Sequence, residues 1–352
     1  MTIAFHDLRR ETAELQAALR STLDDVLAES SFVGGGAVAS FEQEFAQYCG
    51  AAHAVGVGSG TDAIAIALRA AEIGAGDEVI TAANTCLPTV AGIVLAGATP
   101  VLADVDRRTL TLDPDSVAEA IGPRTRALVP VHLYGRRAEM GPLLELAREH
   151  DLRVVEDAAQ AHGAAVVADV GAFSFYPTKN LGALGDAGAV VTSDLAVAER
   201  ARELREYGRR GDGRSFARSG QSRLDTIQAA LLLAKLPLLD GWNARRGELA
   251  SRYTEALRGG AVDVPSGGHH VYHLYVVRSQ ERDALRDRLR TRGVETRVHY
   301  PLAVHEHPAW SDLLRPRALS ESERAAREVL SLPLYPQLTD DEAGRVIDAV
   351  LG

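Results

Sequence analysis

The sequence predicts an α/β protein that has a large, mainly parallel-sheet domain followed by a smaller α+β C-terminal domain. The chain has 352 residues, more than one compact domain usually holds. Its composition is 46% hydrophobic but only 5% aromatic, which favours a layered α/β protein over a sandwich of aromatic-rich strands. From residue 53 to about 192, short apolar runs alternate with helical patterns, as in a parallel sheet covered on both faces.

The elements of the large domain follow one another in this alternating order. An amphipathic helix is expected from Asp7 to Glu29, ending in the Gly34-Gly35-Gly36 turn. The predicted strands are 53–57, 77–82, 99–105, 126–132, 152–158, 171–176 and 188–193. The predicted helices between them are 61–73, 86–96, 113–121 and 140–150.

The rest of the chain predicts a loop, a long helix and the small domain. A helix after Asp194 leads into Tyr207–Ser222, which is polar and rich in Gly, Arg and Ser and therefore predicts a loop. A helical pattern then runs from about Leu224 to Leu257. We place residues 1–240 in the large domain and 241–352 in the small one. The small domain is expected to contain strands at 271–277 and 294–300, and helices at 283–292 and after residue 338.

Charge and cysteine usage exclude several classes of partner. The formal net charge of −10 argues against a nucleic-acid partner, because such proteins present a broad basic surface. No stretch approaches the roughly 20 apolar residues of a membrane span, and the start is charged rather than signal-like, so we expect a cytoplasmic protein with no membrane partner. Cys49 and Cys86 lack metal-ligand spacing, and we interpret His299, His305 and His307 as surface histidines, so no metal site is expected.

Lysine is nearly absent from this arginine-rich chain. It occurs only at Lys179 and Lys235. Arginine stays protonated near neutral pH and cannot form or exchange an imine, whereas lysine can do both. Lys235 lies within the apolar helical run ALLLAKLPLL, where a snorkelling lysine is the ordinary explanation. Lys179 is therefore the candidate for chemistry.

A glycine-rich turn in GVGSGTDAIAIALRA follows the first predicted strand and opens a helix. Its free backbone N–H groups and the positive end of the helix dipole favour an anion, most naturally a phosphate monoester. Thr61 stands where a dinucleotide fingerprint needs its third glycine, so a nicotinamide cofactor fits less well. A tight turn with nothing bound explains the pattern equally well, and this motif alone leaves both interpretations open.

Two further motifs lie at predicted strand ends. Asp157 closes a parallel strand, where a carboxylate can hold a pyridine nitrogen protonated, although a carboxylate that caps the following turn is at least as common. Ser174 ends a later strand, and Pro177 and the nearby glycines place Lys179 in an irregular loop. Together, a phosphate-binding turn, a pyridine-binding acid and an imine-forming lysine predict pyridoxal 5'-phosphate (PLP), held by Lys179 as a Schiff base.

The segments GSGTDAIAIALRA, EDAAQAHGA, FSFYPTKNLGALGDAGAVV, SRLDTIQAALL and SLPLYPQLTDDE resemble the DegT/StrS sugar aminotransferases, which have the PLP-dependent transferase fold type I. The resemblance runs from roughly Phe5 to the C-terminus. It implies that Lys179 forms the internal aldimine and then shuttles a proton. It further implies roles for Asp157 at the pyridine nitrogen and Gln160 at the ring hydroxyl, and for Gly60, Thr61 and Ser174 at the phosphate.

The resemblance also implies a homodimer whose active sites lie at the subunit interface. Gln221 occupies the place of an asparagine that reaches the neighbouring subunit's phosphate, and Cys86 stands where many members stack an aromatic ring on the cofactor. The connection between His162 and Phe173 is shorter than in relatives, and we expect this trimming to leave the site unaffected.

The implied reaction moves an amino group, by family habit from glutamate, to a nucleotide-linked keto-sugar. Likeness at IAFHDLRRE and TDA favours C-3 of a dTDP-3-keto-6-deoxyhexose over C-4 of a dTDP-4-keto-6-deoxyhexose. His299 and Tyr300 are the candidate substrate-binding residues, and most arginines from Arg200 to Arg223 are expected to be solvated. Two alternatives stay open: a nicotinamide-dependent dehydrogenase, and a non-catalytic regulator built on the same fold.

Overall fold

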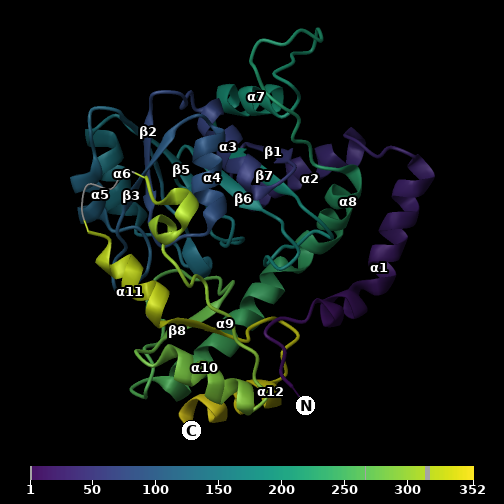
Figure 1. Ribbon diagram of the computed structural model, residues 1–352. Helices are drawn as coiled ribbons and strands as arrows, with labels where there is room; N and C mark the ends of the chain where they lie inside the picture. The colour runs from purple at the N-terminus through teal and green to yellow at the C-terminus, as the bar shows by residue number, and fades with distance from the viewer. Residues whose placement is uncertain (1, 266, 314–317) are drawn as a thin grey trace.

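The computed structural model describes residues 2–265, 267–313 and 318–352, and it is built around a seven-stranded sheet (Figure 1). The strand order is β1-β7-β6-β5-β4-β2-β3. Strand β7 runs antiparallel to both of its neighbours, and the other neighbouring pairs are parallel, which confirms the predicted mainly parallel sheet. The strands are β1 (His53–Val57), β2 (Glu78–Ala82), β3 (Thr99–Ala103), β4 (Thr125–Val129), β5 (Arg153–Asp157), β6 (Val170–Ser174) and β7 (Gly188–Thr192).

Helices pack on this sheet and extend from it. They are α1 (Leu8–Glu29), α2 (Gly35–Tyr48), α3 (Gly60–Ala70), α4 (Leu87–Leu95), α5 (Pro114–Ala120), α6 (Met140–Glu149), α7 (Leu195–Leu204), α8 (Thr226–Lys235) and α9 (Leu239–Leu257). The turn predicted at Gly34-Gly35-Gly36 is only partly present: Gly34 and Gly35 adopt positive φ, but Gly35 and Gly36 already begin α2. Helix α2 was not predicted, since its Gly-Gly start has the composition of a turn.

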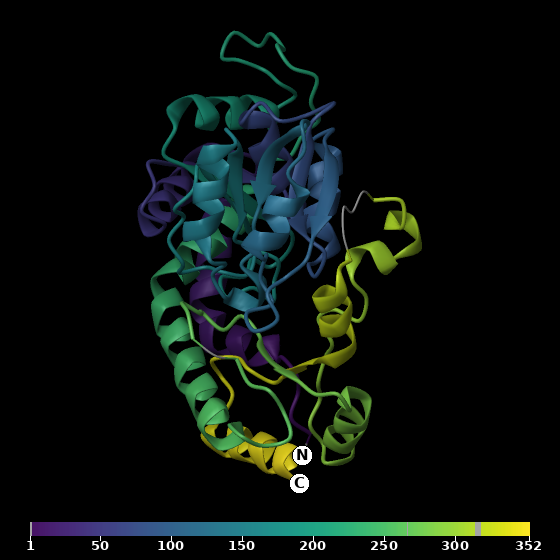
Figure 2. The same cartoon turned by 90° about the vertical axis from the view of Figure 1, so that its left-hand side faces the viewer.

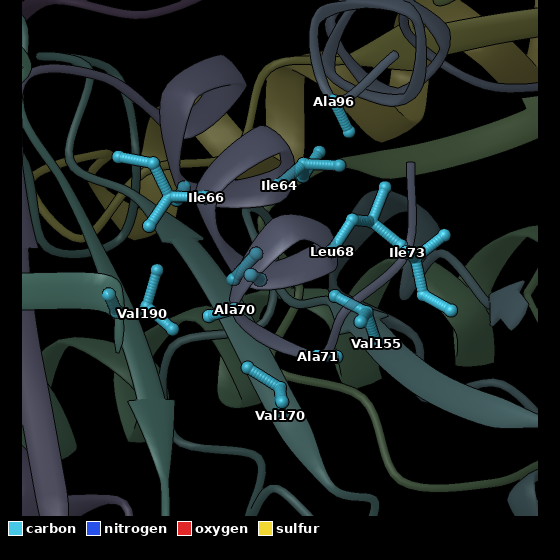
Figure 3. Close-up of a cluster of buried hydrophobic side chains, with 14 of the residues drawn as sticks. Ile64, Ile66, Leu68, Ala70, Ala71, Ile73, Ala96, Val155, Val170 and Val190 are labelled. Carbon is cyan, nitrogen blue, oxygen red and sulfur yellow. The ribbon is translucent and has the colours of Figure 1, made fainter. Parts of the chain in front are cut away.

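Helix α3 is almost entirely buried, and its burial fixes the turn at its N-terminus. Its alanine, isoleucine and leucine side chains pack on the middle strands of the sheet (Figure 3). The residues labelled in this cluster are Ile64, Ile66, Leu68, Ala70, Ala71, Ile73, Ala96, Val155, Val170 and Val190. Since each buried isoleucine or leucine side chain contributes roughly 1.5–3 kcal/mol, this packing fixes the first turn of α3 against the sheet.

The long helix predicted from Leu224 to Leu257 is instead two helices. A 3-10 turn at Leu236–Leu238 separates α8 from α9. Pro237 lies in this turn, and proline has no N–H for the α-helical hydrogen-bond ladder. The loop before α8, by contrast, lies where predicted and extends beyond α7 at the top of Figure 1.

The C-terminal part contains β8 (Tyr275–Arg278), α10 (Arg282–Thr291), α11 (Ser320–Glu328), β9 (Val329–Leu332) and α12 (Asp340–Leu351). The strand predicted at 294–300 is wrong. Val294 bridges to Ile3 and Arg297 bridges to Ser331, so the segment changes partners and forms no continuous ladder. Strand β9, which was not predicted, pairs with β8 instead. The domain boundary after residue 240 stays a prediction.

The N-terminal segment belongs to the core of the C-terminal part. Ile3 is fully buried against α9, β8, β9 and α12, in a cluster that includes Leu249, Tyr275 and Val350. Figure 2 shows both termini at this end of the molecule. Among the described residues, no helix is both long and apolar enough to span a bilayer.

Candidate active site

The Lys179 turn, residues 177–182, lies between β6 and β7. The Lys179 N–H donates to the carbonyl of Tyr176 at 2.8 Å. The turn is closed so tightly that a Cβ on Gly182 would lie 2.3 Å from the carbonyl oxygen of Pro177. The side chain of Lys179 lines two cavities, one of about 330 Å³ and an adjoining one of about 450 Å³. Burial lowers the pKa of Lys179, which favours the neutral amine that can bond to a carbonyl carbon.

The predicted phosphate turn lines the smaller cavity, which we call the cofactor cavity. Ser59 caps α3 by accepting a hydrogen bond from the Asp62 N–H at 3.1 Å. A Cβ on Gly60 would lie 2.5 Å from the Cβ of Ser174, so only glycine allows β6 and α3 to approach this closely. The structure therefore brings Gly60, Thr61 and Ser174 together with Lys179.

Asp157 lines the same cavity at the end of β5. Its Oδ2 accepts from the Thr89 hydroxyl at 2.8 Å, and its Oδ1 accepts from the Ala159 N–H at 3.1 Å. Burial raises the pKa of this carboxyl. A buried carboxylate is stabilised by a cationic partner, and a protonated pyridine nitrogen would supply one.

Gln160 also lines the cofactor cavity, and two hydrogen bonds orient its side chain. Its Oε1 accepts from the Tyr134 N–H at 2.6 Å, while its Nε2 donates to the Tyr300 hydroxyl at 3.2 Å. The amide nitrogen carries a second N–H, which suits a ring hydroxyl. These donors and acceptors fit PLP: a neutral lysine for the aldehyde, an anion turn, a carboxylate for the nitrogen and an amide for the hydroxyl.

Cys86, His299 and Tyr300 also lie around Lys179. Cys86 lines the cofactor cavity, and its thiol is hydrogen-bonded with the Tyr300 hydroxyl, while burial raises the pKa of the thiol. His299 and Tyr300 line the adjoining cavity. The Nδ1 of His299 is hydrogen-bonded with the Ser331 hydroxyl at 2.8 Å, and burial lowers the pKa of His299 to about 4. The two candidate substrate residues therefore lie beside the candidate catalytic lysine.

Gln221 is the one predicted site residue that the chain does not bring to the cavity. It is exposed in the loop before α8, where its main chain bridges to Glu206, and neither of the two cavities includes it. Its neighbour Ser222 does act at the phosphate turn: its hydroxyl accepts from the Gly58 N–H at 2.9 Å and donates to Asp62 at 2.8 Å.

Two predictions about side chains are wrong. Lys235 does not snorkel: it is 3% exposed, because its Nζ donates to Glu11 at 2.7 Å and to the carbonyl of Gly182 at 2.9 Å. His305 is not a surface histidine, since it is 6% exposed and its Nε2 is hydrogen-bonded with Glu323 at 3.1 Å. Across the described ranges, no three His, Cys, Asp or Glu side chains converge as metal ligands.

A buried pair next to Asp157, formed by Glu156 and His132, was not identified from the sequence. Glu156 is fully buried, with its Oε2 2.7 Å from Nε2 of His132. Its Oε1 accepts from the N–H groups of Val167 and Ala168, both at 2.6 Å. These hydrogen bonds hold the shortened connection between His162 and Phe173 against β5. An acid adjacent to Asp157 was visible in the sequence, but its partners are distant in the chain.

Fold and site together define a PLP-dependent aminotransferase of fold type I, with PLP as its cofactor. The comparison with known families makes the assignment specific, because residues 13–351 match the DegT/DnrJ/EryC1/StrS aminotransferase family. The chain belongs to this family, and it is a sugar aminotransferase. The predicted family is confirmed, and the dehydrogenase alternative is wrong.

Similar proteins cover nearly the whole chain. The dTDP-3-amino-3,4,6-trideoxy-alpha-D-glucose transaminase of Streptomyces venezuelae is 46% identical over 99% of this chain and 95% of its own. A pleiotropic regulatory protein of Geobacillus stearothermophilus is 40% identical over 99% of this chain and 98% of its own.

Solved structures agree with this assignment. The crystal structure of S. venezuelae DesV in complex with a ketimine intermediate has a TM-score of 0.96 at 46% identity, covering 99% of this chain and 97% of DesV. The structure of NtdA from Bacillus subtilis with bound cofactor PMP has a TM-score of 0.94 at 32% identity, covering 99% of this chain and 84% of NtdA.

Proposed function

We propose that this enzyme transfers the amino group of glutamate to the C-3 ketone of a dTDP-linked 6-deoxyhexose. The observation that carries the proposal is the placement of Lys179 between the cofactor cavity and the adjoining cavity with His299 and Tyr300. Support for C-3 comes from relatives at 46%, 42% and 40% identity whose names specify dTDP-3-amino sugars. C-4 amination is the second candidate.

In this proposal each site residue has a defined role. PLP, when bound, supplies an electron sink for the carbon that loses or gains a proton. Lys179 would hold the cofactor through its aldehyde and, as a free amine, would accept and return that proton, which its lowered pKa favours. Asp157 holds the pyridine nitrogen protonated, and Gln160 orients the ring through its hydroxyl.

Phosphate binding is assigned to Gly60, Thr61 and Ser174, and Gln221 is proposed to complete it from the partner subunit of a homodimer. Gln221 is exposed and does not line the cofactor cavity of its own chain, which supports this cross-subunit role. Leu27, Phe32 and Val33 are each 54% exposed, and a dimer contact would bury such large apolar side chains. The free thiols of Cys49 and Cys86 support a reducing, cytoplasmic location.

The covalent link is tested first. Borohydride treatment of the PLP-loaded protein, followed by digestion and mass spectrometry, is expected to place the added mass on Lys179. Lys179→Arg should abolish trapping and lower transamination by at least about 10³-fold, whereas Lys235→Arg should still be trapped. Added mass on any other peptide would refute the role of Lys179.

The regiochemistry is tested on the aminated cofactor form. After reaction with glutamate, the protein is mixed separately with dTDP-3-keto- and dTDP-4-keto-6-deoxyglucose, and the spectrum of the PLP form is followed. We expect the spectrum of the PLP form to return only with the 3-keto sugar. Recovery with the 4-keto sugar alone would favour the second candidate. Absence of any reaction with glutamate would refute this donor and would favour a regulator if other amino donors also failed.

A further inference from the structure

A third cavity, of about 660 Å³, lies outside the site described above, and we call it the arginine cavity. It is formed by the loop after β3 (residues 106–110), the segment after β4 (Tyr134 and Arg136), and the C-terminal segments 258–265 and 276–278. None of its lining residues lines the cofactor cavity or the adjoining cavity. Its volume is within the range of small-molecule sites, about 300–1,000 Å³.

The lining is strongly basic in a chain whose formal net charge is −10. Five arginines line the cavity against two aspartates, Asp106 and Asp263. Asp263 is paired with Arg278 at 3.2 Å. Across residues 2–265, 267–313 and 318–352, the exposed guanidinium groups of Arg107, Arg108 and Arg258 form no ion pair within 4.0 Å of a carboxylate. These three cations are available to an anion.

A fourth cation is built into the wall. Arg136 is 5% exposed, and its side chain lies 3.2 Å from where a Cβ on Gly268 would stand. Burial lowers the pKa of Arg136, so an anion in the cavity would stabilise its charged form. Planar guanidinium groups bind the oxygens of carboxylates and phosphates in pairs. Because several arginines line this one cavity, a multiply charged phosphate group fits it better than a carboxylate of a single charge.

Aliphatic side chains from both parts of the chain form another part of the lining, with Leu110 on one side and Val262, Val264 and Val276 on the other. Thr109 and His270 add neutral polar groups. A ligand that matches this lining carries more than one negative charge for the arginines and a less polar group for the aliphatic wall, as the two phosphates and the base of a nucleoside diphosphate do. We propose that the arginine cavity binds a nucleoside diphosphate outside the catalytic centre.

Tyr134 separates this cavity from the catalytic one. It lines the arginine cavity, its N–H donates to Gln160, and its hydroxyl donates to the carbonyl of His299 at 2.5 Å. The two sites are therefore adjacent and are separated by Tyr134, but they have no lining residue in common. Loss of the arginines should leave the catalytic site intact.

The test counts binding sites on the PLP-loaded protein by isothermal titration with dTDP. Arg107→Ala/Arg258→Ala should lose one dTDP site per chain, or weaken it by about a hundredfold, because each charged hydrogen bond contributes about tenfold. The control, Arg286→Ala/Arg290→Ala, removes the same charge from the exposed face of α10 and should bind as the wild type does. Thymidine should show no binding at the lost site.

Three results would overturn the proposal. One is that the wild type, the cavity variant and the control variant all bind the same number of dTDP molecules with the same affinity. Another is that the control variant loses dTDP binding to the same extent as the cavity variant. The third is a parallel tenfold rise in KM for the sugar nucleotide, which would place Arg107 and Arg258 in the substrate site. If the proposed substrate were wrong, the catalytic dTDP site would be missing from the wild type and from both variants. The wild type would still bind one dTDP per chain more than Arg107→Ala/Arg258→Ala.

Discussion

The Nζ of Lys235 lies 2.9 Å from the carbonyl oxygen of Gly182, and this hydrogen bond joins α8 to the turn that carries Lys179. The same Nζ lies 2.7 Å from Glu11 of α1. Both side chains are shielded from solvent, with exposed fractions of 4% and 16%. The second lysine of the chain therefore supports the turn that carries the first.

Lys235→Met is expected to destabilise the protein by about 3 kcal/mol, because it leaves Glu11 without its buried partner. The free energy of unfolding in urea measures this loss. Lys235→Met/Glu11→Leu should recover most of it, since an apolar pair of similar volume removes the unpaired charge. An additive loss in the double variant would show that the ion pair is not the cause.

Thr89→Val removes the hydroxyl that donates to Asp157 while keeping the shape of the side chain. We expect PLP binding to weaken by at least about tenfold, since one hydrogen bond to a charged group contributes about 1.5–3 kcal/mol. PLP release during dialysis measures the effect. Thr85→Val is the matched control, because Thr85 contacts Thr89 at 2.9 Å but not the carboxylate. Equal retention in both variants would contradict a role for Thr89 in positioning Asp157.

Gly60→Ala should abolish tight PLP binding, because the added Cβ would lie 2.5 Å from the Cβ of Ser174. The strand and the phosphate turn would have to separate by about 1 Å to restore ordinary van der Waals contact. Gly241→Ala in α9, where a Cβ meets nothing within 4 Å, is the control and should be neutral or slightly stabilising. Absorbance titration with PLP compares the two, and full-strength binding by Gly60→Ala would contradict this packing.

Glu156→Gln should destabilise the protein in a pH-dependent way. Burial alone would raise the pKa of Glu156, but hydrogen bonds from His132, Val167 and Ala168 lower it below the ordinary value of 4.5. A carboxylate whose pKa is lowered by folding stabilises the protein above pH 4.5, and this contribution is lost as the pH falls through the folded-state pKa. The variant should be about 1–3 kcal/mol less stable at pH 7.

Urea unfolding of both proteins at pH 7 and at successively lower pH below 4.5 measures the gap in the free energy of unfolding. The gap should narrow as the pH falls. A constant gap would mean that the amide disturbs packing instead of removing a charge.

Much of the fold and site could be predicted because the signals are local. The alternation of strands and helices predicted the parallel sheet, and strand ends predicted Asp157, Ser174 and Lys179 at one edge. The structure differs where long-range pairing outweighs the local pattern. Val294 pairs with Ile3, so the expected strand at 294–300 did not form, and β9 took its place beside β8.

By itself, the sequence determined the chemistry of the site: the residue types, their order and the glycine at position 60 are properties of short segments. Only the tertiary structure decided how these groups are supported and what surrounds them. Lys235, Thr89 and Tyr134 act through partners distant in the chain, at Gly182, Asp157 and His299. The arginine cavity likewise forms only when residues 106–110, Tyr134 and Arg136 meet the C-terminal segments 258–265 and 270–278. Periodicity and motif spacing report neighbours along the chain, whereas packing and burial depend on contacts that folding creates.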